Sequence, residues 1–174
     1  MANALTAADG EELRNVRVAL LRKGECLAEE QGEVMCERLG FGGSAVLRLS
    51  RLVTMAEERD GFSLSIDFKP GLNRAKLRGR IAREREERTR EPLSSSLRAL
   101  LPAKLVLPVG RRAGVPLNRG WADLRAHDVE CLVQTLKGMR FDVVGHEGFE
   151  RALVTAGGVA LDEVHPETME SRLV

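Results

Sequence analysis

The sequence predicts an α+β fold, in which a small antiparallel β-sheet or barrel carries an inserted helical bundle. Two patterns lead to this prediction. Alternating apolar and polar residues, typical of half-buried strands, occur toward both ends of the chain. Apolar residues at helical spacing occupy the middle. The patterns change at Pro70 and Gly138, which places the sheet in residues 1–69 plus 139–174 and the helices in residues 70–138.

Composition and charge describe a globular protein without a strong overall field. The 174 residues are 43% hydrophobic, which allows one domain or two small ones with a buried core. The 27 Lys and Arg residues nearly balance the 26 Asp and Glu residues, and the net charge is +1. No long-range field therefore selects a nucleic acid or an anionic membrane, and we expect neither as a partner.

Targeting signals and metal-ligand patterns are not recognisable in the sequence. No run approaches the ~18 apolar residues that a membrane-spanning helix needs, and residues 1–12 lack the plan of a signal peptide, so we expect a cytoplasmic protein. The three cysteines form no Cys-x-x-Cys pair, which predicts small buried side chains and not a disulfide framework or zinc site. The three histidines match no ligand spacing, and we expect no metal ion. These residues are Cys26, Cys36, Cys131, His127, His146 and His165.

The first part of the chain carries the strand pattern. Apolar residues at alternate positions predict several strands separated by turn residues, and the last of these strands alternates most regularly. The expected strands are 15–21, 25–30, 33–39 and 62–68.

A glycine-rich turn precedes the first expected helix, whose apolar residues recur at helical spacing. The turn reads Gly40-Phe41-Gly42-Gly43-Ser44, and we expect Ser44 to be the N-cap. Free backbone N–H groups at such a turn can hold phosphate. The glycine spacing does not match the Gly-x-Gly-x-x-Gly fingerprint of dinucleotide-binding proteins, so we favour a structural turn.

The middle of the chain begins with an arginine-rich helix. Asn73 is its expected N-cap, and Leu77 and Ile81 are the expected buried residues. Basic side chains occupy the other faces over residues 74–90, which suggests a nucleic-acid-binding domain as one possible function.

Three observations argue against that function. Arg80 and Glu84, and likewise Arg83 and Glu87, have the i,i+4 spacing of ion pairs. The chain contains no tyrosine, and no aromatic residue lies between positions 68 and 121 on which bases could stack. We therefore favour a solvated helix surface.

Prolines divide the remaining helical part. Pro92 begins a helix, Pro102 marks the next break, and Pro108 interrupts a further helical piece. A loop then holds Trp121, which we expect in the core, and the last helix ends at Gly138.

The chain ends in a strand pattern that a glycine pair interrupts. Apolar residues predict a strand over 141–144 and a strand pair over 149–164, which lies around the step at Gly157-Gly158. Two residues without Cβ allow a positive φ or the close approach of another molecule to the backbone. A bulge or tight bend in a sheet is the structural alternative.

The residues around the glycine pair resemble a known family. Thr155-Ala156-Gly157-Gly158-Val159 is followed, after an acidic link, by Thr168-Met169-Glu170-Ser171-Arg172. In residues and spacing this resembles the signature of the aminoacetone-oxidase-like FAD-dependent oxidoreductases, bacterial flavoproteins whose nucleotide-binding domain is interrupted by an insert of a barrel-like part and a few helices. The second motif stands where that family returns from the insert to the FAD domain.

A second stretch carries the same resemblance with differences. Residues 32–47 align without gaps to a family pattern that contains Phe-Thr-His before a glycine-rich turn, but Cys36, Glu37 and Arg38 stand in those three places. A carboxylate and a guanidinium thus replace a hydroxyl and an imidazole. Arg38 is the candidate to meet an anionic substrate or a flavin phosphate, and the alternative is an exposed Glu–Arg pair.

The resemblance implies the insert domain of a FAD-dependent oxidoreductase, which covers the flavin and closes a substrate pocket. His165, within the signature, joins Arg38 as a substrate-facing candidate, while the resemblance identifies no catalytic residue and no substrate. The implied cofactor-binding residues are Thr155, Ala156, Gly157 and Gly158. Because these residues include no nucleotide-binding βαβ unit, we expect the chain to bind no FAD tightly alone, to be inactive alone, and to need the missing FAD-binding domain as its partner.

Two other classes of function stay open. The chain is a non-catalytic protein-interaction module if the arginine-rich helix or a sheet edge docks another protein. It is a nucleic-acid-binding domain if residues 74–90 bind phosphates.

Overall fold

The structure is a computed structural model that describes residues 8–58, 60–89, 91–153 and 157–173. The chain divides into two compact units, of which the first ends at Val144 and the second begins at Gly145.

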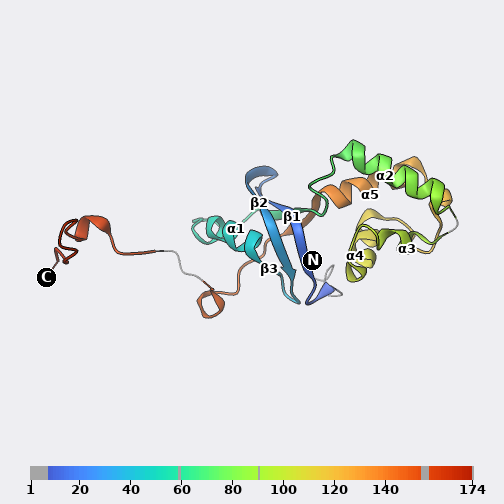
Figure 1. The fold of residues 1–174 in the computed structure, drawn as a ribbon. Coiled ribbons are helices and arrows are strands. Elements are labelled where there is room, and N and C mark those ends of the chain that lie inside the picture. Colours follow the sequence, from blue (N-terminus) through green and yellow to red (C-terminus); the bar gives the residue numbers. More distant parts are fainter. Residues whose placement is uncertain (1–7, 59, 90, 154–156, 174) are drawn as a thin grey trace. The chain divides into compact units, whose positions relative to one another are not determined.

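The first unit contains a five-stranded antiparallel sheet that curls into a half-barrel, with the strand order β3-β2-β1-β4-β5 (Figure 1). The alternation of apolar residues accounts for the strands, since every second residue faces the core. In β4, for example, Phe62, Leu64 and Ile66 are all buried. The predicted α+β fold is confirmed. The strands are β1 Glu12–Arg22, β2 Glu25–Cys36, β3 Phe41–Gly42, β4 Phe62–Asp67 and β5 Met139–Asp142.

The strand β2 is continuous where two strands were expected. Gly32, which stands between the two expected strands, lies beneath helix α1, Ser44–Thr54. A Cβ at Gly32 would come within 2.8 Å of the Ser44 Oγ and 3.2 Å of an Arg48 Nη atom. The glycine therefore allows α1 to pack closely on the sheet, and the strand does not end there.

The glycine-rich turn also serves this packing. Gly43 has φ 92° and is the N-cap of α1, and a Cβ there would lie 2.6 Å from the Glu33 carbonyl oxygen. The prediction that Ser44 caps the helix is wrong, because Ser44 is the first helical residue and its hydroxyl accepts a hydrogen bond from the Glu33 N–H at 3.2 Å. The turn is structural, since its tightest glycine faces backbone of the same chain.

Four further α-helices among the described residues form the helical half. Asn73 caps the first as expected, its side chain accepting a hydrogen bond from the Lys76 N–H at 2.8 Å. Pro108 does not interrupt its helix, which spans Ala103–Ala113. The proline removes one backbone hydrogen bond, and burying the apolar face of the helix contributes more free energy than this loss costs. The helices are α2 Arg74–Glu87, α3 Leu93–Leu97, α4 Ala103–Ala113 and α5 Ala126–Gly138.

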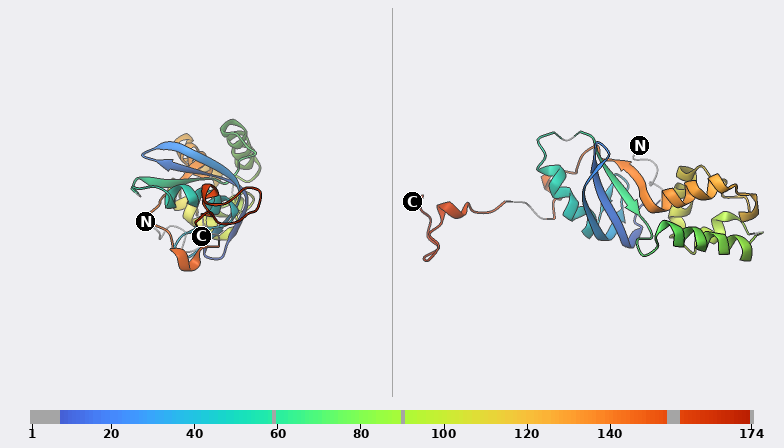
Figure 2. Two further views of the ribbon diagram at one scale, coloured as in Figure 1. Left: turned by 90° about the vertical axis from the view of Figure 1, so that its left-hand side faces the viewer. Right: turned by 90° about the horizontal axis from the view of Figure 1, so that it is seen from above.

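The helical half extends from one end of the sheet, while α1 packs at the other (Figure 2). Trp121, in the short 3-10 helix η3 Trp121–Asp123, is 0% exposed, which confirms its predicted place in the core. The largest fully buried neighbours in this half are Leu77, Ile81, Leu93, Leu97, Leu100, Leu105, Leu132 and Leu136.

Within the first unit, a buried ion pair connects the sheet to the helical half. The Lys137 Nζ, near the end of α5, lies 2.5 Å from the Asp67 Oδ2 at the end of β4, and these side chains are 11% and 12% exposed. The same ammonium donates hydrogen bonds to the carbonyl oxygens of Lys69 and Leu72 at 2.9 and 2.6 Å. Every hydrogen on the ammonium thus has an acceptor where the chain crosses from sheet to helices.

The second unit contains no strand of a sheet among its described residues. The strand pair expected over 149–164 is not found, and this part instead holds the short 3-10 helices η4 Phe149–Arg151 and η5 Leu161–Glu163. One isolated bridge pairs Val164 with Ser171. The prediction failed because an alternating pattern becomes a strand only beside another strand.

Candidate functional site

The glycine pair lies in the open. Gly157 has φ 138°, and a Cβ at Gly157 or Gly158 would meet nothing within 4 Å. Packing among the described residues therefore does not account for either glycine. Thr155 and Ala156, the other implied cofactor-binding residues, lie outside the described part of the chain.

His165 belongs to a compact turn that follows the glycine pair. The His165 N–H donates to the carbonyl oxygen of Glu170, and the Met169 N–H donates to the carbonyl oxygen of His165, both at 2.8 Å. The Arg172 N–H closes the turn on the Glu163 carbonyl oxygen, also at 2.8 Å. Met169 adopts φ 61°, an uncommon conformation for a residue with a Cβ. The turn orders its backbone locally and leaves the imidazole of His165 exposed.

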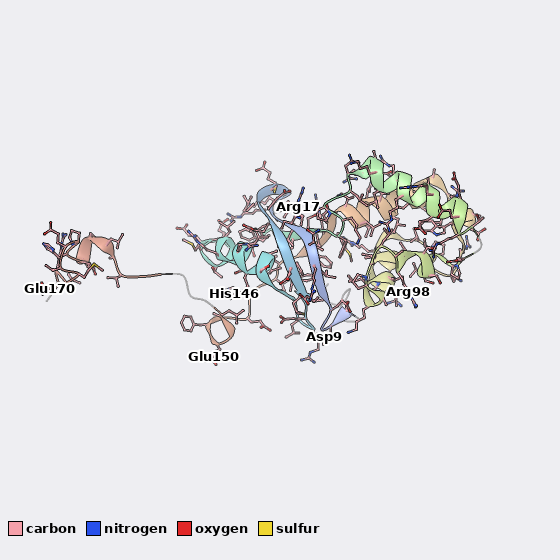
Figure 3. All side chains as sticks on the ribbon, in the orientation of Figure 1. Asp9, Arg17, Arg98, His146, Glu150 and Glu170 are labelled. Carbon is pink, nitrogen blue, oxygen red and sulfur yellow. The ribbon has the colours of Figure 1, made fainter. Side chains whose placement is uncertain are left out.

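The apolar side chains of the second unit are exposed. No described residue between 145 and 173 is buried, and Phe149 and Leu161 are 82% and 87% exposed. Figure 3 shows these side chains as sticks, with His146, Glu150 and Glu170 labelled in the same unit. Burying one large apolar side chain contributes about 1.5–3 kcal/mol, so this unit lacks the usual source of stability. The exposed large apolar residues of the unit are Phe149, Leu153, Val159, Leu161, Met169 and Leu173.

Arg38 lies in the first unit, in the exposed turn between β2 and β3. The backbone groups of Glu37 and Gly40 hydrogen-bond to each other at 3.0 and 3.2 Å and close the turn. Arg38 makes no ion pair with any described residue, so the Glu37–Arg38 pair considered as an alternative does not form. Its guanidinium is available to an anion. His165, the other substrate-facing candidate, lies in the second unit.

Cys36 is not a nucleophile at neutral pH. Burial, with a smaller contribution from the charge of Glu11, raises the pKa of its thiol to about 11. The prediction of buried cysteines holds for Cys36 and is wrong for Cys26, which is exposed near the hairpin between β1 and β2. Cys131 is partly buried, and its Sγ lies 3.4 Å from the His127 Nε2 one helical turn away.

Among the described residues, no group of three or more His, Cys, Asp or Glu side chains is placed to hold a metal ion. In the same part of the chain, no helix has the length and apolar character needed to cross a membrane.

The distribution of charge is the feature that sequence reasoning missed. Residues 70–138 carry 15 Lys and Arg against 7 Asp and Glu, a net charge of +8. The rest of the chain carries 12 against 19, a net charge of −7. The overall +1 hides two halves of opposite sign, and a count for each predicted domain would have revealed them.

Three curated relatives cover most of this chain. It is 26% identical to the 3-dehydro-bile acid delta(4,6)-reductase of Clostridium scindens over 159 residues, 91% of this chain and 39% of the relative. It is 29% identical to the ribosomal RNA dihydrouridine synthase of Escherichia coli over 153 residues, 85% of this chain and 36% of the relative. It is also 29% identical to the enzyme of that name from Haemophilus influenzae over 170 residues, 98% of this chain and 39% of the relative. The chain thus spans less than two fifths of the length of these relatives.

A family model described as the HI0933-like protein barrel and H2TH domain matches residues 2–154. The description agrees with the architecture, since a curled sheet continues into a helical half. The match confirms the resemblance drawn from the sequence motifs. The chain therefore belongs to the HI0933-like flavoprotein family, in which it corresponds to the barrel and H2TH domain, the insert of these oxidoreductases.

Proposed function

We propose that this chain is the cap domain of a FAD-dependent oxidoreductase, inactive alone, that covers the substrate side of a flavin held by a separate FAD-binding domain. The proposal rests on one observation in the second unit: an open glycine pair lies in the same segment as exposed apolar side chains that form no core there. A partner surface beside the flavin would bury these side chains.

The described residues fit part of a flavin and not all of it. Gly157 and Gly158 offer bare main chain against which a flat ring can lie. The glycine-rich turn at Gly43 offers no comparable space, because it packs against β2. The pyrophosphate would thus be held by the FAD-binding domain, and this chain would contribute the cover. When bound, FAD supplies the hydride chemistry.

Two side chains are proposed to face the substrate. The unpaired, exposed guanidinium of Arg38 would meet an anionic group and orient it. The imidazole of His165 would donate or accept a hydrogen bond next to the glycine pair, on a turn whose backbone is already ordered. The relatives are named a reductase and a dihydrouridine synthase, and both names fit a flavin-dependent oxidoreductase.

The test uses two proteins. The chain alone is titrated with FAD, and we expect no protein-bound flavin spectrum. In a chimera, this chain replaces the matching segment of the E. coli relative, and the purified chimera is expected to retain flavin. Flavin bound by the chain alone, or a folded chimera without flavin, would contradict the proposal.

A matched pair of variants locates the contact. Gly158→Val in the chimera places a branched side chain against the ring and should lower the bound flavin per protein. Gly145→Val is the control, because Gly145 lies in the same unit and is equally open. Equal flavin content in the two variants would remove the glycine pair from the site.

A further inference from the structure

The helical half carries a concentration of basic residues that the cap function does not explain. Its net charge is +8, and 12 of its 15 basic residues are arginines. Arginine binds phosphate with a planar fork of donors, whereas lysine is a point charge that serves solubility equally well. The expectation that no nucleic acid binds was based on expected ion pairs, on the lack of aromatic residues in this part of the chain, and on the overall charge, which averages this half with an acidic one.

Three basic residues of α2 share one face. Lys76, Arg80 and Arg83 follow one another at i, i+4 and i+7, so their side chains project in nearly the same direction. They line an open groove of about 580 Å³ along the helix. Gly79 lies between them, and a Cβ there would meet nothing within 4 Å, so the helix backbone itself is accessible.

The ion pairs expected to neutralise this face do not form. Glu84 pairs with Arg88 at 3.2 Å and not with Arg80, which donates a hydrogen bond to the Ala99 carbonyl oxygen at 3.5 Å. Arg83 and Lys76 make no ion pair with any described residue, although Glu84 and Glu87 also line the groove. The face therefore keeps a positive charge.

Two classes of partner do not fit this half. Stable attachment to a membrane surface combines basic charge with exposed apolar side chains, and among the described residues of the helical half only Leu107, at 45%, is a large exposed one. Single-stranded nucleic acid requires exposed aromatic rings, and Trp121, the one aromatic residue between 70 and 138, is fully buried. The phosphate backbone of a folded, double-stranded nucleic acid makes neither demand.

We propose that the α2 face formed by Lys76, Arg80 and Arg83 binds the phosphate backbone of folded RNA. RNA is favoured over DNA because two relatives are named ribosomal RNA dihydrouridine synthases. This proposal rests on the proposed function, because RNA bound at this face would be the substrate of the flavin-dependent reaction. Its test needs no flavin, so the two proposals fail separately.

Binding of the full chain is measured by fluorescence anisotropy with a labelled RNA hairpin of about 16 base pairs, the length that a double-stranded-RNA-binding domain spans. A DNA duplex of the same sequence, an unstructured RNA and phosphatidylserine-containing vesicles are measured in parallel. The titrations are repeated between about 50 and 200 mM KCl, because released counterions report the number of phosphate contacts.

Two double variants remove the same amount of charge. Lys76→Gln with Arg83→Gln should weaken hairpin binding about tenfold and lower the salt slope by about 2, since each lost phosphate contact removes close to one unit. Arg17→Gln with Arg51→Gln is the control on the acidic half, where both residues are exposed and Arg17 is labelled in Figure 3. The control should bind as the unaltered chain does, and both variants should keep its circular dichroism spectrum.

Tighter binding to the hairpin than to the other three probes, lost only in the α2 variant, supports the proposal. It is overturned by undetectable hairpin binding at low salt, by equal loss in the two variants, or by tighter binding to the DNA, the unstructured RNA or the vesicles.

Discussion

The two units of this chain contain similar apolar residues and use them differently. In the first unit, leucines, isoleucines and Trp121 are buried in a continuous core between sheet and helices. In the second, leucines and Phe149 are exposed on a turn-rich segment with no buried residue among those described. Apolar residues that find no core in their own unit are available for another surface to cover, as the proposed cap role requires. The first unit thus has a core of its own, and the described part of the second does not.

The ion pair between Asp67 and Lys137 provides the strongest test that the sheet and the helical half of the first unit unfold together. Lys137→Met leaves Asp67 charged and almost buried, and we expect the free energy of unfolding to fall by about 3–5 kcal/mol. Urea denaturation measures the change. Adding Asp67→Asn removes the unpaired charge and should restore part of the loss. A loss below about 1 kcal/mol would mean that the sheet and helices do not depend on this pair.

Matched leucine truncations compare the two units directly. Leu132→Ala opens a cavity in the core of the first unit and should cost about 2–5 kcal/mol. Leu161→Ala removes an exposed side chain in the second unit and should change the stability of the isolated chain by less than about 0.5 kcal/mol. Similar losses from the two substitutions would contradict the contrast between the units.

The buried thiol of Cys36 makes the stability of the first unit depend on pH. Its folded-state pKa is raised from 9.0 to about 11, so the folded state holds the thiol proton more tightly than the unfolded state. Its contribution is therefore complete below pH 9 and declines as the pH rises toward 11, by about 2–3 kcal/mol in the free energy of unfolding. Cys36→Ala should flatten this decline, as urea titrations of the variant and of the unaltered chain at several pH values would establish. Identical pH profiles for the variant and the unaltered chain would refute the assignment to Cys36.

Much of the first unit could be predicted because its patterns find partners within the chain. The strand at 62–68 was recognisable from its alternation, and it lies between β1 and β5. The continuation of β2 through Gly32 was not predicted, since the strand pattern does not show that this glycine admits helix α1. Glu84 was ambiguous as well, because Arg80 and Arg88 are both four residues away, and helical spacing alone cannot choose between them.

The candidate site could be predicted in part. The family motifs located the glycine pair and His165, and the structure adds that the pair is open and that a hydrogen-bonded turn carries the histidine. Sequence patterns could not reveal that the described residues of 149–164 form no strand pair, because the alternation itself does not show whether a neighbouring strand is present. The basic half was visible in the sequence, but a count over the whole chain concealed it.

Hydrogen exchange of residues 157–173 tests the central claim most directly. In the isolated chain, the amides of His165 and Arg172 should exchange far faster than that of Phe68, which donates to the Leu136 carbonyl oxygen in the core of the first unit. In the flavin-loaded chimera, protection should rise across residues 157–173 while that of Phe68 stays the same. Exchange of this segment that is equally fast in both proteins would contradict its docking against a flavin-binding domain.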